Sequence, residues 1–311
     1  MNQPIPVILD CDPGHDDAMA ILLAAANPAV ELLGITTVSG NGSLDKVTYN
    51  AQRICTLAGI TPPIARGAND PLIGKASAAP TIHGASALDG AELPEPAYDV
   101  SPLSAVELIA ELVRECDRPV TLIPTGPMTN IASFLLAHPE LHSRIEKISF
   151  MGGSVTRGNW TPYAEFNIWA DPEAADVVLT SGLPIVMTGL NVSHMALATP
   201  EVLDRIDALG THLATTCVDL LKFFAHTYRD VFGMPDPPLH DPVAVACVID
   251  PSIVSTEFLP VSIELNGTLT RGATVVDVHG VTGREANVHV AMDLNVDRFW
   301  NMMMDSIRDL G

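Results

Sequence analysis

Short apolar runs alternate with longer helical stretches through the first two thirds of the 311-residue chain. The apolar runs lie at residues 6–10, 31–38, 120–123, 147–151 and 184–188, and each is separated from the next by sequence of helical character. Because these runs are apolar on both sides, they are typical of parallel strands that helices cover on either face. The pattern predicts an α/β fold with an open, doubly wound, mostly parallel sheet flanked by helices.

The last third of the chain departs from this alternation. The elements predicted there are one or two helices within 201–230, further helices at 241–248 and 296–310, and strands at 261–265, 273–278 and 288–292. A stretch rich in Pro, Gly and Ala at 69–102 predicts a long loop, and loops of that length are commonly lids or binding loops. Because no repeat or linker interrupts the chain, we predict a single domain over residues 1–311.

The balance of charge limits the partners of the chain. Lys and Arg number 16 and Asp and Glu 37, which gives a net charge of −21. Binding to phosphate-rich surfaces needs clustered Lys and Arg, so the composition argues against nucleic acid and against an anionic membrane. Five scattered cysteines without a C-x-x-C pair, and no basic leader before a short apolar run, predict a cytoplasmic protein with reduced thiols.

The most informative stretch follows the first predicted strand and reads Asp10-Cys11-Asp12-Pro13-Gly14-His15-Asp16-Asp17. Alternation along the strand puts Asp10 and Asp12 on one side, and the last two Asp begin a helix. Ligands bind at this end of strands in open α/β sheets. Buried carboxylates repel one another unless a cation lies between them, and oxygen ligands favour Ca²⁺ or Mg²⁺ over Zn²⁺. The alternative is that these Asp cap the helix and complement its dipole.

Three weaker signals occur later in the chain. His240-Asp241 opens a predicted helix, either as an acid–base residue with a metal ligand or as a surface residue with a helix cap. Asn159, Glu165 and Asn167 lie in a loop, where they suit hydroxyl binding or simply a solvated surface. Pro124-Thr125-Gly126-Pro127 follows a strand and could expose a main-chain carbonyl to a ligand. Phosphate-binding glycine loops and the H-E-x-x-H motif are absent from the sequence.

Together these stretches resemble the nucleoside hydrolase family, particularly its inosine–uridine-preferring and pyrimidine-preferring members. The resemblance begins with the D-x-D-P-G-x-D-D run at 10–17 and covers nearly the whole chain. The later blocks follow in the order of the family, at 35–41, 124–126, 151–153, 164–167, 171–175 and 240–242. The resemblance implies the open α/β fold of this family, with Ca²⁺ at the bottom of the active site.

The resemblance also implies roles for individual residues. The Ca²⁺ ligands at matching positions are Asp12, Asp17, Asp241 and the main-chain carbonyl of Thr125. The residues that match those binding the ribose hydroxyls are Asp16, Asn41, Asn159, Glu165 and Asn167. His240 matches a histidine beside the base, and His83 matches a second histidine near the leaving group. Tyr228 is interpreted either as a contact to the base or as a packed aromatic residue.

The implied reaction is hydrolysis of the N-glycosidic bond of ribonucleosides such as uridine, cytidine or inosine, giving base and ribose. Asp12 would take a proton from a Ca²⁺-bound water as that water attacks C1′ of an oxocarbenium-like sugar. His240, with His83 nearby, would supply the proton that the departing base needs. The family forms dimers and tetramers, so the resemblance implies a homo-oligomer, and a role in nucleoside salvage fits a cytoplasmic protein.

The sequence departs from the common family pattern near the leaving group. Ala85-Ser86-Ala87 stands where many relatives carry Glu-Ser-Gly, and residues 229–239 lie in a segment that varies strongly in the family. His15 replaces an apolar residue and is interpreted as supporting rather than catalytic. These departures leave the preferred base open.

Three alternatives to this interpretation remain at this stage. One is a purine-restricted hydrolase. Another is a nucleoside-binding protein of the same fold without activity. The third is a phosphatase of the haloacid dehalogenase type, which also carries D-x-D after its first strand but would release inorganic phosphate.

Overall fold

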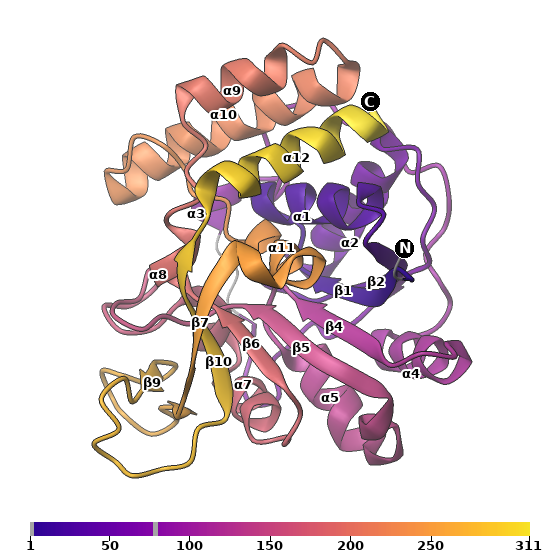
Figure 1. The fold of residues 1–311 in the computed structure, drawn as a ribbon. Coiled ribbons are helices and arrows are strands. Elements are labelled where there is room, and N and C mark those ends of the chain that lie inside the picture. The colour runs from indigo at the N-terminus through magenta and orange to yellow at the C-terminus, as the bar shows by residue number, and fades with distance from the viewer. Residues whose placement is uncertain (1–2, 77–79) are drawn as a thin grey trace.

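The apolar runs of the sequence form the middle of an eight-stranded sheet in the computed structural model, which describes residues 3–76 and 80–311 (Figure 1). The strands are arranged in the order β3-β2-β1-β4-β5-β6-β10-β7, and every neighbouring pair is parallel except β10 and β7. Their bounds are β1 Ile5–Cys11, β2 Val30–Thr37, β3 Ile64–Arg66, β4 Val120–Pro124, β5 Ile145–Met151, β6 Ile185–Thr188, β7 Val254–Leu259 and β10 Val288–Leu294. A small antiparallel sheet pairs β8 Val261–Ile263 with β9 Thr274–Val276.

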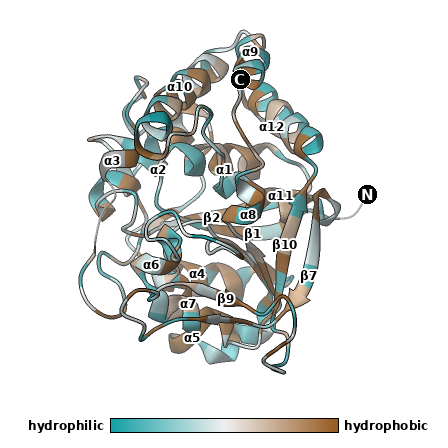
Figure 2. Cartoon of the chain, turned by 90° about the vertical axis from the view of Figure 1, so that its left-hand side faces the viewer, coloured by the Kyte–Doolittle hydropathy of each residue, from teal (hydrophilic) through white to brown (hydrophobic). Residues whose placement is uncertain are grey.

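Helices cover both faces of this sheet. Figure 2 shows α1, α11 and α12 on one side of the strands and α4, α5 and α7 on the other. The helices are α1 His15–Ala26, α2 Leu44–Leu57, α3 Pro80–His83, α4 Ala105–Glu115, α5 Thr129–Ala137, α6 Phe166–Ala170, α7 Pro172–Leu179, α8 Leu190–Ser193, α9 Pro200–Asp207, α10 His212–Phe232, α11 Asp241–Ile249 and α12 Val296–Leu310, with short 3₁₀ turns at Pro139–Arg144 and Pro251–Ile253.

Each face of the sheet has its own apolar core. Along β1, Val7 and Leu9 belong to the core under α1 and α11, whereas Ile8 belongs to the core under α4 and α5. This follows from the alternation of side chains along a strand, and it explains why β1 is apolar from Ile5 to Leu9. The predicted fold class is therefore confirmed.

The structure corrects the element boundaries in several places. Residues predicted as one or two helices form two, α9 and α10. The predicted loop at 69–102 contains the short helix α3, and its residues 77–79 lie outside the described part of the chain. β3 and β7 had no counterpart in the sequence analysis. β7 is an edge strand with four exposed residues in a row, so it lacks the apolar signature of the inner strands.

The order of the strands locates the crevice where ligands bind in folds of this type. The chain reaches β3 by moving outward from β1 through β2, and then returns to place β4 on the other side of β1. The chain that follows β1 runs toward one edge of the sheet, and the chain that follows β4 runs toward the other edge. This divergence opens a crevice beyond the carboxyl ends of these two strands. The run at 10–17 spans the end of β1 and the start of α1, and Thr125 follows β4, so both lie at this crevice.

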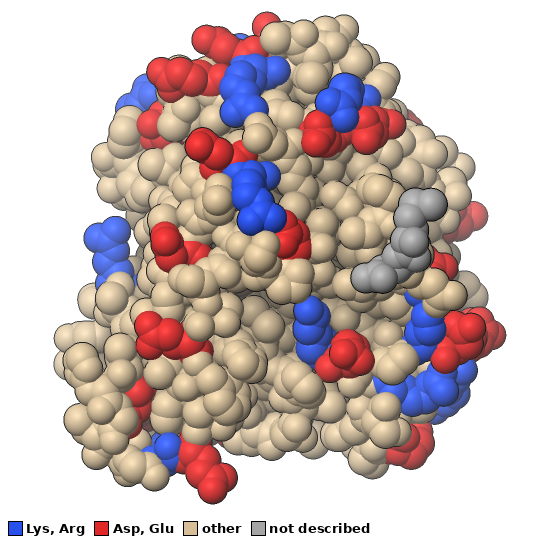
Figure 3. Space-filling view, in the orientation of Figure 1, with Lys and Arg blue, Asp and Glu red and all other residues tan. Residues whose placement is uncertain are grey.

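Charged residues are mixed over the face of the molecule seen in Figure 3, where most Lys and Arg side chains lie beside Asp or Glu. Ion pairs such as Arg308–Asp305 and Arg271–Glu173 are examples of this mixing. In the part of the chain that the structure describes, no helix is both long and apolar enough to cross a membrane.

Candidate active site

The turn between β1 and α1 is organised around Asp17. Its carboxylate accepts the main-chain N–H groups of Gly14 at 3.0 Å and Asp12 at 3.3 Å, so it satisfies donors at the start of the helix. It also accepts hydrogen bonds from Thr125 Oγ1 at 2.9 Å and Asn41 Nδ2 at 3.1 Å. Asp17 thereby ties the ends of β1, β2 and β4 together and is fully buried.

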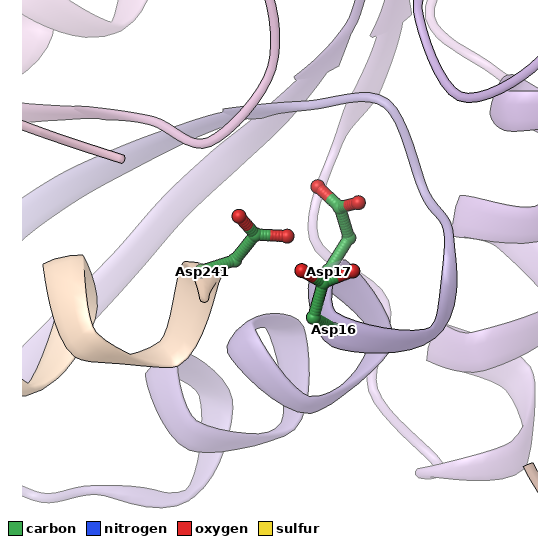
Figure 4. Close-up of side chains that lie close together, drawn as sticks. All are labelled: Asp16, Asp17 and Asp241. Atoms are coloured by element: carbon green, nitrogen blue, oxygen red, sulfur yellow. The ribbon is translucent and has the colours of Figure 1, made fainter. Parts of the chain in front are cut away.

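Asp241 enters the same space from another helix. Figure 4 shows its side chain pointing from the start of α11 toward Asp16 and Asp17 at the start of α1. One carboxylate oxygen from each of these three residues lies within 4.8 Å of the others. Asp12 stands beside this group, and its Oδ2 accepts the main-chain N–H of Asn41 at 2.6 Å. The structure therefore gathers three Asp residues of the run at 10–17, namely Asp12, Asp16 and Asp17, around Asp241 from the later His240-Asp241 pair.

Electrostatics make this cluster unstable in the absence of a cation. Burial, followed by repulsion from the neighbouring Asp17 carboxylate, raises the pKa of Asp16 to about 8. Burial followed by the surrounding carboxylates also raises the pKa values of Asp12 and Asp241 well above their ordinary range. Asp12 Oδ1 and Asp16 Oδ1 are buried oxygens without a hydrogen-bond partner. Unpaired oxygens on crowded carboxylates are the donor set that a hard divalent cation satisfies, so the residues present fit such an ion.

Asp10 differs from the other members of the run. Its Oδ1 accepts hydrogen bonds from Thr36 Oγ1 at 2.6 Å and from Asn130 Nδ2 at 2.7 Å. Asn130 also donates to the Thr37 carbonyl at 3.0 Å and accepts from the Ala68 N–H at 2.8 Å. Asp10 therefore joins β1 to β2 and to the start of α5, and burial raises its pKa to about 7.

The loop after β5 carries the polar residues predicted to bind a sugar. Glu165 caps α6 by accepting the N–H groups of Asn167 at 2.9 Å and Ile168 at 3.3 Å, and burial raises its pKa to about 7. Asn159 Oδ1 accepts the Phe166 N–H at 2.9 Å. Asn167 Nδ2 donates to the Thr125 carbonyl at 2.7 Å, which links this loop to the end of β4. The three residues are thus held together by capping contacts.

An open cavity connects the carboxylates with these polar residues. It is lined by Asp16, Asn41, Ile82, His83, Thr125, Met151, Asn159, Trp160, Glu165, Phe166, Asn167, Phe224, Tyr228, Phe232, His240 and Asp241. Of the residues predicted for the site, only Asp12 and Asp17 are absent from this lining among the described residues, and both are fully buried beneath it.

A buried hydrogen-bonded chain borders one side of the cavity. His240 Nδ1 lies 2.8 Å from Ser193 Oγ, and His240 Nε2 lies 2.7 Å from the Tyr228 hydroxyl. Burial lowers the pKa of His240 well below its ordinary value, so the ring is neutral. Burial also raises the pKa of Tyr228 well above its usual range, and the carboxylates of Asp16 and Asp241 add to that effect. Tyr228 therefore keeps its proton and remains a hydrogen-bond donor.

His83 also lines the cavity, and its ring is stacked on aromatic neighbours. Its ring lies 5.3 Å from that of His15 and 5.4 Å from that of Phe224, between ring centroids. His83 Nδ1 and His15 Nδ1 are 3.0 Å apart. Burial lowers the pKa of His15 to about 4 and that of His83 well below its ordinary value. Both rings are therefore neutral near pH 7.

Comparisons with known proteins agree with this geometry. Residues 7–301 match the family described as inosine-uridine preferring nucleoside hydrolase. The chain belongs to the nucleoside hydrolase family. A pyrimidine-specific ribonucleoside hydrolase, RihA, of Shewanella sp. strain ANA-3 is 46% identical over 304 residues, which are 97% of this chain and 96% of that protein. RihA of Escherichia coli O127:H6 is 44% identical over 306 residues, 98% of each chain.

A solved structure shows the same fold with a different preference in its name. The purine-preferring ribonucleoside hydrolase of Gardnerella vaginalis superimposes with a TM-score of 0.91 at 33% identity and covers 98% of each chain. This nucleoside hydrolase is therefore an enzyme, and the phosphatase alternative is excluded. The names of its relatives differ in the base that they favour.

Several residues of this nucleoside hydrolase site were missed by sequence reasoning. Ser193 on His240, Asn130 on Asp10 and the apolar cavity residues Ile82 and Phe224 come from distant parts of the chain. Of these residues, Phe224 could have been predicted from its spacing to Tyr228, because residues four apart share a face of a helix. Ser193 and Asn130 carry no local signal of this kind.

Proposed function

We propose that this nucleoside hydrolase cleaves the N-glycosidic bond of pyrimidine ribonucleosides, uridine and cytidine, to free base and ribose. The observation that carries the proposal is the cavity whose floor holds unpaired carboxylate oxygens and whose walls hold the Glu165 loop and the Tyr228–His240 pair. Carboxylates suit a sugar that becomes positively charged, and a neutral hydrogen-bond donor suits a base that leaves with negative charge.

Ca²⁺ is the cation that we propose for the cluster, held by Asp12, Asp17, Asp241 and the Thr125 carbonyl. When bound, the ion neutralises the carboxylates and lowers the pKa of a water molecule that it contacts. Asp12 is the base, because its Oδ1 is buried and has no partner, whereas its Oδ2 is held by the Asn41 N–H at 2.6 Å. In its ionised form Asp12 accepts the proton from the attacking water.

The remaining polar residues orient the ribose. The cavity is lined by Asp16, which has an unpartnered Oδ1, and by Asn41, Asn159, Glu165 and Asn167. Hydroxyl groups of the sugar can donate to these carboxylates and to the amide oxygens. The same carboxylates stabilise the positive charge that develops on the ring as the bond to the base lengthens.

Tyr228 and His240 supply the proton for the leaving base. When Ser193 donates to His240 Nδ1, the proton of the neutral ring is on Nε2 and points to the Tyr228 oxygen. This arrangement leaves the Tyr228 proton free for the substrate. His240 then stabilises the phenolate by its Nε2–H bond after the proton is transferred. His83 lines the same cavity and completes its polar surface.

Preference for pyrimidines is supported by the RihA relatives, which are 44% and 46% identical, against 33% for the purine-preferring protein. The resemblance further supports a homo-oligomer, a dimer or tetramer, that acts in cytoplasmic nucleoside salvage. The match over residues 7–301 supports a single domain for the chain.

The test pairs a chemical readout with a matched variant. Free ribose and free uracil released from uridine are measured for the wild type, for Asp12→Asn and for Asp204→Asn, an exposed carboxylate on α9. We expect equal amounts of ribose and uracil from the wild type and from Asp204→Asn, and loss of turnover in Asp12→Asn and after chelation. Uridine binding without release of ribose by the Ca²⁺-loaded wild type would favour the non-catalytic alternative, and release of ribose from purine nucleosides alone would favour the purine-restricted one.

A further inference from the structure

His15 and His83 form a hydrogen-bonded pair whose proton positions are set by a main-chain carbonyl. His15 is the first residue of α1 and is fully buried. Its ring stacks against Phe223 and Phe224, with centroid distances of 5.4 and 5.0 Å and interplanar angles of 8° and 7°. On the far side from His83, His15 Nε2 lies 2.8 Å from the Asp89 carbonyl oxygen.

That carbonyl is fixed in place by its own loop. The Asp89 carboxylate accepts the N–H groups of Ala85 at 2.7 Å and Ser86 at 3.0 Å, and the Asp89 N–H donates to the His83 carbonyl at 3.1 Å. Residues 83–89 are therefore closed into a tight loop. A carbonyl oxygen can only accept, so the nitrogen that faces it at 2.8 Å must carry a proton.

The proton on His15 Nε2 determines the rest of the pair. A neutral imidazole has one proton, and neither ring has a carboxylate within hydrogen-bond distance among the described residues. His15 Nδ1 is therefore an acceptor. His83 Nδ1, at 3.0 Å, must then donate to it, which leaves the lone pair of His83 on Nε2. This nitrogen makes no hydrogen bond to a described residue, and His83 lines the cavity.

The alternative arrangement, in which His83 Nδ1 accepts a hydrogen bond, has less favourable contacts. The main-chain N–H of His15 lies 3.3 Å from His83 Nδ1 and would favour an acceptor there. That arrangement needs the His15 proton on Nδ1, which would turn the lone pair of Nε2 against the Asp89 carbonyl at 2.8 Å. Two acceptors at that distance repel, and a contact of 3.3 Å is near the long limit of a hydrogen bond.

We propose that His15 is a positioning residue that keeps His83 in the tautomer with its proton on Nδ1, so that His83 presents an Nε2 acceptor to the nucleoside. His83 then accepts a hydrogen bond from a donor group of the substrate, a ribose hydroxyl or a base N–H, and does not protonate the leaving base. The second half of this inference rests on the proposed function, because it assumes a nucleoside in the cavity.

The tautomer is tested without turnover. Protein labelled with ¹⁵N at histidine is measured by long-range ¹H–¹⁵N NMR, and the His83 signals are assigned by their loss in His83→Phe. We expect a protonated Nδ1 and an unprotonated Nε2 on His83 in the wild type. In His15→Phe the ring of residue 15 no longer accepts, and its main-chain N–H becomes the partner of His83 Nδ1, so the proton should move to Nε2. A wild-type His83 with its proton on Nε2, or a tautomer unchanged in a folded His15→Phe, overturns the proposal.

The acceptor role is tested with substrate analogues. For uridine, 3-methyluridine, 2′-deoxyuridine and 5′-deoxyuridine, kcat/KM is measured in the wild type and in His83→Phe. The analogue that lacks the donor contacting Nε2 should lose about tenfold in the wild type and nothing further in His83→Phe. The methylated analogue identifies a base N–H, and the deoxy analogues identify a hydroxyl. Equal penalties in both proteins for every analogue contradict the acceptor role, whereas failure to cleave any nucleoside contradicts the proposed function and leaves the NMR result standing.

Discussion

Removal of the cation should make the stability of this protein fall steeply as the pH rises from 7 to 8. In the metal-free chain, burial and mutual repulsion raise the pKa of Asp16 to about 8 and those of Asp12 and Asp241 well above the ordinary value of 3.8. The folded chain then holds protons that the unfolded chain has already lost. The protonated carboxyls therefore favour the folded chain. Their contribution to the free energy of unfolding is complete below about pH 4, and it is lost as the pH rises through the pKa values of the folded protein.

Between pH 7 and 8, the pH dependence of stability comes from the buried carboxylates and not from the buried histidines. The buried histidines 15, 83 and 240 have lowered pKa values, so they oppose this trend only below about pH 6.5, where histidine of the unfolded chain gains a proton. Each retained carboxyl proton lowers the free energy of unfolding by about 1.4 kcal/mol per pH unit, so one to three protons give about 1.4 to 4 kcal/mol. At about 2 °C per kcal/mol, the melting temperature should fall by about 3 to 8 °C.

The assay is thermal unfolding followed by circular dichroism at pH 7.0, 7.5 and 8.0, with Ca²⁺ or with chelator. Bound Ca²⁺ keeps the cluster ionised, so the loaded protein should be more stable and should show little slope over this range. Asp16→Asn should reduce the slope of the chelated protein, and the exposed Asp204→Asn should leave it unchanged. A melting temperature of the chelated protein that is flat or rises from pH 7 to 8 would show that the cluster does not retain protons, as would equal slopes with and without Ca²⁺.

Three further predictions concern single residues. Asp12→Ala should lower kcat by more than a hundredfold while uridine still binds in equilibrium dialysis, since its role is to accept a proton; a variant that retains several per cent of wild-type kcat would contradict that role. Tyr228→Phe should lower kcat on uridine by about a hundredfold but spare 4-nitrophenyl riboside, whose leaving group needs no proton, and equal losses on both substrates would exclude the Tyr228 assignment. Ala87 has a positive φ of 65°, so Ala87→Gly should stabilise the protein by about 1 kcal/mol in thermal unfolding, and unchanged or lower stability would count against strain there.

The arrangement of the inner sheet could be predicted from the sequence because its strands are buried on both faces. β1 and β4 are apolar apart from Asp10 and Thr121, and both strands are almost completely buried. β7 was missed because Ser255, Thr256 and Glu257 lie exposed on an edge strand, and β3 was missed because it has only three residues. Local patterns carry little information about either.

The carboxylate cluster could also be predicted, since three of its members are neighbours in the sequence. Its supporting contacts could not, because they join residues far apart in the chain. His15 and His83 are 68 positions apart, Ser193 and His240 are 47 apart, and Asp10 and Asn130 are 120 apart. Such contacts depend on how α1, α3, α8 and α11 pack on the sheet, which no local spacing reveals.

The central claim is that the cavity above the Asp cluster hydrolyses pyrimidine ribonucleosides. The most direct test is to incubate the Ca²⁺-loaded protein separately with uridine, cytidine, inosine, adenosine and guanosine, and to quantify free ribose and free base in each reaction. We expect equal amounts of ribose and base from uridine and cytidine, at a kcat/KM well above that for the purine nucleosides. Release from the purine nucleosides alone, or no release of ribose from any of the five by folded, Ca²⁺-loaded protein, would contradict it.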